Sequence, residues 1–351
     1  MSEAGYRESL GTRLARRSLT IPTVFLAAAL GWITLPAWLP VCLLVDLLRP
    51  ARLRTTRFAL FGLGYLSYEV AGLLASLGIW LGWGPWRRAP QHHYLDRNHR
   101  LQAWWAGGLF RAATRILSLE VHLDEAPADD RPLLVFVRHA SMVDSLLPAA
   151  LVSARAGTQL RYVLKRELLL DPCLDVVGQR LPNAFVKRGS TSPEQELEAV
   201  RALARDLGPG EGVAIFPEGT RFTPEKRERA LERIAASGDP ERLERARGLR
   251  RVLPPRSGGP LAVIAEAPEA DVFFLAHRGF DGAASVSDLL AGRLIGRRID
   301  VRSWRVPICE LPTSPREQLR WLDEQWAILD QWVDEGPAAF ASSAANEKET
   351  S

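Results

Sequence analysis

Cysteine is scarce in this chain of 351 residues, which contains only Cys42, Cys173 and Cys309. None of the three lies close to another in sequence, so the chain predicts neither a zinc site nor a disulfide framework. We expect all three to be packing residues in a reducing compartment. The chain also has no internal repeat. It lacks the Gly-x-Ser-x-Gly nucleophile elbow, which disfavours a serine esterase.

Net charge and hydropathy are both close to balance over the whole chain. The net charge is +4, the isoelectric point is near 9.2 and the mean hydropathy is −0.06. This average combines a strongly apolar region, residues 1–90, with an Arg-rich remainder. A mild basic excess is compatible with binding to nucleic acid, to anionic lipid head groups or to a phosphorylated substrate. Because the basic residues flank apolar segments, membrane association is the better interpretation.

Two long apolar segments, 21–48 and 58–83, carry one charged residue each, Asp46 and Glu69. Both exceed the ~20 apolar residues that cross a hydrocarbon core. A cleaved signal peptide fits poorly, because the first segment is too long and a second one follows. We therefore predict that residues 1–90 form a membrane-anchoring helical region. Glu69 is either functional within the membrane or a snorkelling or helix-paired carboxylate.

Basic residues flank these segments on every side, and a simple two-span hairpin conflicts with that pattern. Pro36 and Pro40 break the first segment near its middle. We favour segments that dip into one leaflet and return, while two true spans stay open. The chain is thus expected to be an integral or monotopic membrane protein with its remainder on the cytoplasmic face. The basic flanking residues are Arg13, Arg16, Arg17, Arg49, Arg52, Arg54, Arg57, Arg87 and Arg88.

Residues 91–336 are predicted to form one α/β domain. An amphipathic helix over 97–117 opens it, with Trp104 and Trp105 suited to a membrane interface or to the core. Strands alternating with helices then favour an α/β sheet. A Glu- and Arg-dense insert, 225–251, predicts a solvated helical pair, and the tail 337–351 is expected to be disordered. The predicted strands are 119–124, 133–137, 160–164, 184–187, 212–217, 272–276 and 299–304, and the predicted helices between them include 144–157, 193–207 and 225–247.

The first candidate site is the pair His139 and Asp144, which follows the predicted strand 133–137. On a continuous helix this separation rotates the two side chains by about 140°, so they would not face each other. They meet only if His139 lies in the strand-to-helix turn and Asp144 in the helix. The carboxylate could then hold one imidazole nitrogen while the other nitrogen accepts a proton. A His-x4-Asp spacing alone also arises by chance.

Two further motifs end predicted strands and offer donors to an anion. Residues 215–221 read IFPEGTR, where Pro217 and Gly219 force a turn and Arg221 presents a planar fork suited to phosphate. Residues 185–190 read FVKRGS, with Lys187 and Arg188 as a second anion site. Each motif also has a purely structural interpretation. Residues 215–221 could be a strand-ending turn with a surface arginine, and residues 185–190 could carry a solvated charge pair.

Taken in this order, the three motifs resemble those of the glycerolipid acyltransferase family, which includes acylglycerol-phosphate and lysocardiolipin acyltransferases. His139 and Asp144 match its first motif with Ser141 between them, Arg188 matches the second, and Phe216 to Arg221 match the third in full. The stretch VLPPRSGG is similar to the fourth, with Pro254 as the counterpart. Arg138 departs from the Asn that many relatives carry before the histidine. The resemblance covers roughly residues 104–334.

The resemblance implies a mixed-sheet acyltransferase domain with helices around it. It implies that His139 is the general base, that Asp144 orients it, and that the base activates a lysophospholipid hydroxyl to attack an acyl thioester. It implies no metal or cofactor, and it implies an acyl-CoA or acyl carrier protein thioester as co-substrate. Membrane lipid is an implied partner, whereas nucleic acid is not a partner. The implied acceptor is 1-acyl-sn-glycerol-3-phosphate, with lysocardiolipin and other lysophospholipids left open. The residues implied to bind the acceptor are Lys187, Arg188, Glu218, Gly219, Thr220, Arg221 and Pro254, although the charge of Glu218 suits a basic side chain or a hydroxyl better than phosphate.

Two rival functions stay open on the sequence. A hydrolase could use the same His–Asp pair to activate water and release the acyl group. A membrane-anchored module could bind anionic lipid through its Arg-rich faces without catalysis. Intact His139, Asp144 and Glu218 in matching contexts favour the transferase.

Overall fold

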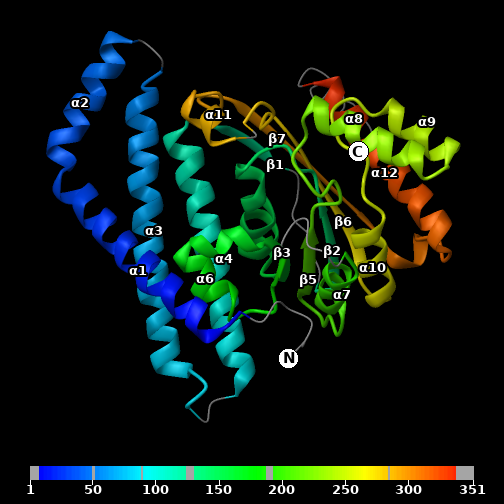
Figure 1. The fold of residues 1–351 in the computed structure, drawn as a ribbon, viewed down its shortest axis with the longest axis horizontal. Coiled ribbons are helices and arrows are strands. Elements are labelled where there is room, and N and C mark those ends of the chain that lie inside the picture. Colours follow the sequence, from blue (N-terminus) through cyan, green and yellow to red (C-terminus); the bar gives the residue numbers. More distant parts are fainter. Residues whose placement is uncertain are drawn as a thin grey trace, which may run out of the picture.

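The protein is described by a computed structural model that covers residues 8–49, 52–87, 90–123, 130–186, 193–283 and 285–336. Lys187, Arg188 and the tail 337–351 lie outside the described residues, so the expectations for them stay predictions. Figure 1 shows a central sheet with the N-terminal helices on one side and the C-terminal helix on the other.

A seven-stranded sheet forms the centre of the fold, in the order β1-β7-β6-β2-β5-β3-β4. Only β6 and β7 pair in antiparallel fashion, and the other neighbours are parallel. The predicted α/β mixed sheet is therefore confirmed, and each predicted strand is present within a few residues of its expected bounds. The strands are β1 (Glu120–Leu123), β2 (Leu133–Val137), β3 (Gln159–Lys165), β4 (Ala184–Val186), β5 (Glu211–Ile215), β6 (Asp271–Arg278) and β7 (Arg298–Val306).

Strand β2 lies at the centre of the sheet, and all five of its residues are buried. An unbroken apolar run is expected for a strand that is covered on both faces. Leu133, Val135 and Val137 contribute to the core beneath α4, and Leu134 and Phe136 to the core beneath α7, α10 and α12. The alternation of side chains along the strand thus divides the interior into two apolar layers.

Helices cover both faces of the sheet (Figure 1). The region predicted as a helix over 144–157 is irregular, because it consists of a 3-10 turn, a π-helical stretch and a short α-helix. The α-helices are α1 (Leu10–Ile33), α2 (Leu35–Leu48), α3 (Arg54–Trp83), α4 (Gln91–Ile116), α5 (Ala154–Ala156), α6 (Pro172–Gly178), α7 (Pro193–Ala204), α8 (Pro224–Ala236), α9 (Pro240–Gly248), α10 (Gly258–Glu266), α11 (Val286–Leu290) and α12 (Pro315–Glu335). The other helical elements are the 3-10 helices η1 (Val143–Leu146), η3 (Arg166–Leu170) and η4 (Ile308–Glu310) and the π-helix η2 (Pro148–Ser153).

The first apolar segment is broken between α1 and α2, which meet at an angle of 72°. The break falls at Thr34, and Pro36 lies in the first turn of α2, where a missing N–H is tolerated. Pro40 remains inside α2. By length and composition, α3 is one candidate membrane span in the described residues, and the bent pair α1–α2 is a second candidate as a broken span or a re-entrant loop.

Polar contacts fasten these helices to one another and to the α/β domain. The Asp46 carboxylate accepts the backbone N–H groups of Thr55 and Thr56, at 2.9 and 2.8 Å, and so caps the first turn of α3. Glu69 is fully buried and accepts hydrogen bonds from Trp105 Nε1 on α4 and from the N–H of Cys173 on α6, both at 2.9 Å. Glu69 is thus the helix-paired carboxylate that was one of its predicted alternatives.

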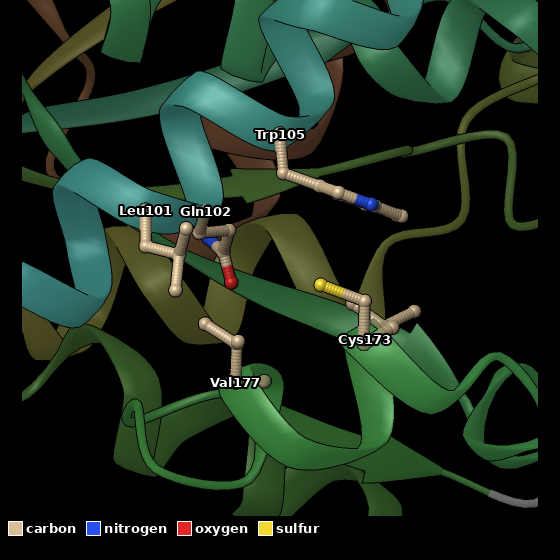
Figure 2. A pocket seen from close by; sticks show the side chains of 7 residues that line it. Leu101, Gln102, Trp105, Cys173 and Val177 are labelled. Carbon is tan, nitrogen blue, oxygen red and sulfur yellow. The ribbon is translucent and has the colours of Figure 1, made fainter. Parts of the chain in front are cut away.

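Helices α4 and α6 meet in a tightly packed junction beneath α3. Leu101, Gln102 and Trp105 extend from α4 towards Cys173 and Val177 on α6 (Figure 2). The space left between them is about 10 Å³, which is the volume of one water molecule at most. This junction holds the helices together and has no room for a lipid.

The charged insert forms the predicted helical pair, α8 and α9. Its solvated character is only partial, because α9 packs on α12. Arg242 Nε and Arg245 Nη2 lie 3.3 and 3.4 Å from the buried Asp323 carboxylate of α12. The insert therefore helps to hold α12 against the sheet.

Candidate active site

His139 and Asp144 meet in the turn that follows β2. His139 Nδ1 lies 3.0 Å from Asp144 Oδ1, and the Asp144 side chain is fully buried. Asp144 belongs to the 3-10 turn η1, which brings its carboxylate back towards His139. The predicted geometry, with the histidine in the turn and the aspartate in the helical element, is therefore present. Since Nδ1 faces Asp144, the other ring nitrogen, Nε2, is left for a substrate.

The carboxylate of Asp144 is held by the backbone of the same turn. The N–H groups of Ala140 and Ser141 both donate to Oδ2 at 2.6 Å. Burial opposes ionisation, but hydrogen bonds from His139 and His277 hold the pKa of Asp144 well below its usual range. Asp144 is therefore a carboxylate at neutral pH, fixed in the orientation that directs His139.

Glu218 lies in the turn after β5 and binds the backbone of the turn after β2. Its Oε1 accepts the N–H of His139 at 2.7 Å, and its Oε2 accepts the N–H of Leu253 at 2.9 Å. Only 2% of Glu218 is exposed, and burial raises its pKa to about 8 against the opposing effect of Arg138. Both carboxylate oxygens of Glu218 thus bind backbone amides of the protein, and its expected contact with the acceptor stays a prediction.

The segment 250–253 is held by two carboxylates through four consecutive backbone amides. Asp330 on α12 accepts the N–H groups of Arg250, Arg251 and Val252 at 2.6–3.0 Å. The next N–H, from Leu253, is the one that binds Glu218. Pro254 follows and is buried, so its part in the fourth motif is to continue this segment rather than to contact the cavity.

A cavity of about 280 Å³ opens beside His139, at the carboxyl ends of parallel strands. Open α/β sheets bind their ligands at this edge. The lining combines an apolar wall with charged groups at Lys165, Glu196 and Arg256. Of the described residues that are predicted to bind the acceptor, Gly219 lines the cavity, whereas Thr220, Arg221 and Pro254 do not. The lining residues are His139, Val163, Leu164, Lys165, Val186, Glu196, Leu197, Val200, Ile215, Phe216, Pro217, Gly219, Arg256, Gly259 and Pro260.

Gly219 and Arg256 shape the cavity on the side of the second turn. Gly219 has a φ of +67°, and an added Cβ would lie 2.7 Å from Arg256 Nε. Arg256 is anchored by its backbone N–H, which donates to the carbonyl oxygen of Pro217 at 2.8 Å. The sequence prediction missed Arg256, although it stands only two residues after Pro254 in the fourth motif.

Arg138, the residue that departs from the family pattern, points away from the cavity. Its side chain is fully buried and pairs with the Asp281 carboxylate. It also donates to the carbonyl oxygens of His277 and Arg251, at 2.7 and 2.9 Å. Arg138 therefore joins the turn after β2 to β6 and to the segment 250–253. Within the described ranges, no cluster of three or more His, Cys, Asp or Glu side chains is arranged to hold a metal ion.

This arrangement is that of an α/β protein with a carboxylate-oriented histidine at the carboxyl edge of its sheet, facing a cavity. Residues 118–267 match the family model described as Acyltransferase. The chain is 30% identical over 177 residues to the lyso-ornithine lipid O-acyltransferase of Pseudomonas aeruginosa, a match covering 49% of this chain and 63% of that one. It is 24% identical over 216 residues to the probable 1-acyl-sn-glycerol-3-phosphate acyltransferase 5 of Arabidopsis thaliana, covering 60% and 55%.

These matches support the glycerolipid acyltransferase family that the motifs predicted. Its matches span less than two thirds of the length of these curated relatives. A crystal structure of the 1-acyl-sn-glycerophosphate acyltransferase from Thermotoga maritima is similar at a TM-score of 0.45 and 15% identity, over 76% of this chain and 97% of that one.

Proposed function

We propose that this protein transfers a fatty acyl group from a thioester to the hydroxyl of a lysophospholipid, with 1-acyl-sn-glycerol-3-phosphate as the default acceptor and phosphatidic acid as the product. The observation that carries this proposal is the His139–Asp144 pair at the wall of the cavity. The thioester is acyl-CoA or acyl carrier protein. Lysocardiolipin and other lysolipids are the alternative acceptors.

His139 acts as the base of this reaction. Its Nε2 takes the proton of the acceptor hydroxyl, whose oxygen then attacks the thioester carbonyl carbon. The tetrahedral intermediate collapses as the carbon–sulfur bond breaks, and the thiolate leaves with the proton from the imidazolium. The new ester bond and a free thiol are the products. Asp144 stays ionised throughout and stabilises the imidazolium that forms between the two proton transfers.

The cavity supports this choice of substrates by its chemistry. Its apolar wall, which includes Val163, Val200 and Ile215, suits an acyl chain. Arg256 and Lys165 supply positive charge on the same cavity, which suits the phosphate of an acceptor or donor. Lys187 and Arg188 remain further candidates for this role.

The test is acyl transfer by the full chain in detergent, with labelled oleoyl-CoA or oleoyl carrier protein and a panel of acceptors. The panel holds the lysophosphatidic, lysocardiolipin, lysophosphatidylinositol and lyso-ornithine acceptors, the last because one relative bears that name. We expect label in one diacylated product and a loss of about 10²–10⁴-fold in the variant His139→Ala. Free fatty acid as the sole product would favour the hydrolase. Lipid binding without either product would favour the non-catalytic module.

The N-terminal helices are proposed to embed in one leaflet of a membrane, with the α/β domain on the cytoplasmic face. Monomeric soluble proteins rarely expose apolar patches larger than a few hundred Å², yet α1 and α2 expose many large apolar side chains. Contacts to the domain occur near both ends of this region, since Arg17 binds Asp175 and the Arg57 side chain donates to the carbonyl oxygen of Ile116. The exposed residues include Leu19, Leu26, Leu30, Trp32, Ile33, Val41, Leu44, Leu47 and Leu48.

Flotation with anionic phospholipid vesicles tests this embedding. The double variant Leu47→Asp/Leu48→Asp is expected to reduce the vesicle-bound fraction at least about tenfold, because each buried leucine contributes about 1.5–3 kcal/mol. Ile328→Asp is the matched control, since Ile328 is 49% exposed on α12, across the sheet from α2 (Figure 1). Equal flotation of both variants would contradict the proposed membrane face.

A further inference from the structure

A second histidine, His277, approaches the Asp144 carboxylate from the neighbouring strand β6. Its Nε2 lies 3.4 Å from Asp144 Oδ2 and 2.9 Å from the carbonyl oxygen of Arg138. The side chains of His277 and Asp144 are both fully buried. His139 contacts Oδ1 of the same carboxylate, so the two imidazoles flank Asp144 through its two different oxygens.

The ring of His277 is fixed by a reciprocal link with Arg138. The Arg138 carbonyl accepts from His277 Nε2, and the Arg138 guanidinium donates to the His277 carbonyl at 2.7 Å. Phe280 packs edge-on against the imidazole, with ring centroids 5.3 Å apart. The charged groups around this ring are Asp144, Arg138 and Asp281, the last of which pairs with Arg138. His277 therefore has little freedom to turn away from Asp144.

The contacts of His277 also define where its proton lies. Nε2 faces two acceptors, a carbonyl oxygen and a carboxylate, so this nitrogen must carry a hydrogen. Nδ1 is buried and has no hydrogen-bond partner among the described residues. A proton on Nδ1 would be a buried donor without an acceptor, which is costly. The contacts thus place the hydrogen of this ring on Nε2.

We propose that His277 is a positioning residue for the acyl transfer, one that holds Oδ2 of Asp144 so that Oδ1 stays directed at His139 Nδ1. This inference rests on the proposed function of the His139–Asp144 pair. His277 does not line the cavity, so it acts on the substrate only through Asp144. By sharing the charge of the carboxylate, it also limits how strongly Asp144 retains the imidazolium of His139. Residues that orient metal ligands in the same indirect way change activity by about 10–100-fold, and we expect an effect of similar size here.

The test compares two amides that differ in reach, in the full chain in detergent with oleoyl-CoA and 1-oleoyl-glycerol-3-phosphate. The amide nitrogen of Gln can occupy the position of His277 Nε2, whereas the shorter Asn cannot reach it. We expect His277→Gln to keep at least about a third of kcat and His277→Asn to lose about 10–100-fold, with KM unchanged in both. His122→Gln, at an exposed histidine of β1, is the control that leaves activity unchanged.

The pH profile separates positioning from mere packing. In His277→Asn, Asp144 retains the imidazolium proton of His139 more strongly, so the acid limb of kcat/KM should move to higher pH. Equal rates and profiles for the Gln and Asn variants would overturn the role of His277 but leave the proposed function intact. Full transfer by His139→Ala, or none by the unmodified chain with any acceptor, would overturn the proposed function and this inference together.

Nitrogen-15 NMR of histidine-labelled protein provides a readout that does not depend on turnover. We expect His277 to show the neutral form with its hydrogen on Nε2, assigned by the loss of one resonance in His277→Gln. A hydrogen on Nδ1, or a charged ring at neutral pH, would contradict the arrangement from which the role is inferred.

Discussion

The turns that follow β2 and β5 each bury one carboxylate, yet the two groups differ in their electrostatic state. Asp144 receives two imidazole donors as well as backbone amides, and its pKa is held below the usual range. Glu218 receives two backbone amides and no imidazole, and burial raises its pKa to about 8. The effect of burial on the pKa is thus outweighed by hydrogen bonds at Asp144, in the turn after β2. It dominates at Glu218, in the turn after β5.

This difference separates the group that works in the chemistry from the group that holds the chain in place. A carboxylate that remains ionised can stabilise a transient imidazolium beside it. A carboxyl that binds two amides on different segments instead fixes the distance between those segments. The motif Phe216–Arg221 therefore contains both a residue that lines the cavity, Gly219, and a buried residue that holds two segments together, Glu218.

The largest effect is expected at the first turn. Asp144→Asn replaces one acceptor oxygen by an NH₂ group, which cannot accept from both His139 and the amides of the turn. We expect kcat to fall by about 10²–10⁴-fold while the acceptor still binds. Asp288→Asn, at the N-terminal capping box of α11, is a control of the same chemistry. If Asp144→Asn retained more than about a tenth of the activity, the two carboxylates would not differ in function.

A smaller effect is expected at the second turn. Glu218→Gln leaves one backbone N–H, of His139 or Leu253, facing an amide donor, at a cost of about 1–3 kcal/mol. We expect an activity loss of about tenfold, accompanied by a lower midpoint of thermal unfolding. Activity equal to that of Asp144→Asn, without a change in unfolding, would show that Glu218 takes part in the chemistry.

The pH dependence of stability should have opposite signs at the two turns. The folded state holds a proton on Glu218 that the unfolded chain releases above pH 4.5, so the free energy of unfolding decreases between pH 4.5 and about 8. Asp144 stabilises the fold above its ordinary pKa of about 3.9, and this stability is lost as the pH falls below that value. Denaturant unfolding should show that Glu218→Gln flattens the first slope and that Asp144→Asn flattens the second. Unaltered slopes in both variants would refute the assigned charge states.

The smallest effect is expected at Arg256, which lies against the second turn and lines the cavity. Arg256→Ala should raise the KM for a phosphate-bearing acceptor about threefold to fivefold, as an exposed cation contributes modestly. Its kcat should stay near that of the unmodified enzyme. Arg250→Ala is the control, since that side chain is 76% exposed and lies 3.6 Å from Asp334 at the end of α12. Identical KM values for the two variants would remove Arg256 from the acceptor site.

The sequence was sufficient for features that are local in the chain. Apolar runs such as residues 133–137 predicted the strands, and the spacing of His139 and Asp144 predicted the turn geometry in which the two could meet. The irregular stretch after Asp144 was not predicted. The spacing between apolar residues on one face of a π-helix differs from that of an α-helix by no more than a residue or two. The break of the first apolar segment was predicted from Pro36 and Pro40, but Pro40 lies inside α2. The angle of the break was not predicted.

The remaining features depend on contacts between distant segments, and no spacing rule identifies them. His277 stands 133 residues after Asp144, on a strand whose apolar pattern is otherwise ordinary. The role of Glu218 depends on backbone amides, which every residue except proline offers, so its partners could not be chosen from side-chain types. Arg138 is similar, because its partners include two backbone carbonyl groups.

The segment 250–253 has a further consequence for how this protein can vary. All four of its N–H groups are bound by Asp330 or Glu218, whereas the contacts involve none of its side chains. Replacement of one side chain by another, proline excepted, would leave these hydrogen bonds in place. Insertion or deletion of a single residue would shift every amide out of register with its carboxylate. This short stretch should therefore keep its length constant during evolution. Its exposed positions, 250 and 251, should tolerate changes of identity, whereas Val252 and Leu253 are buried and should stay apolar.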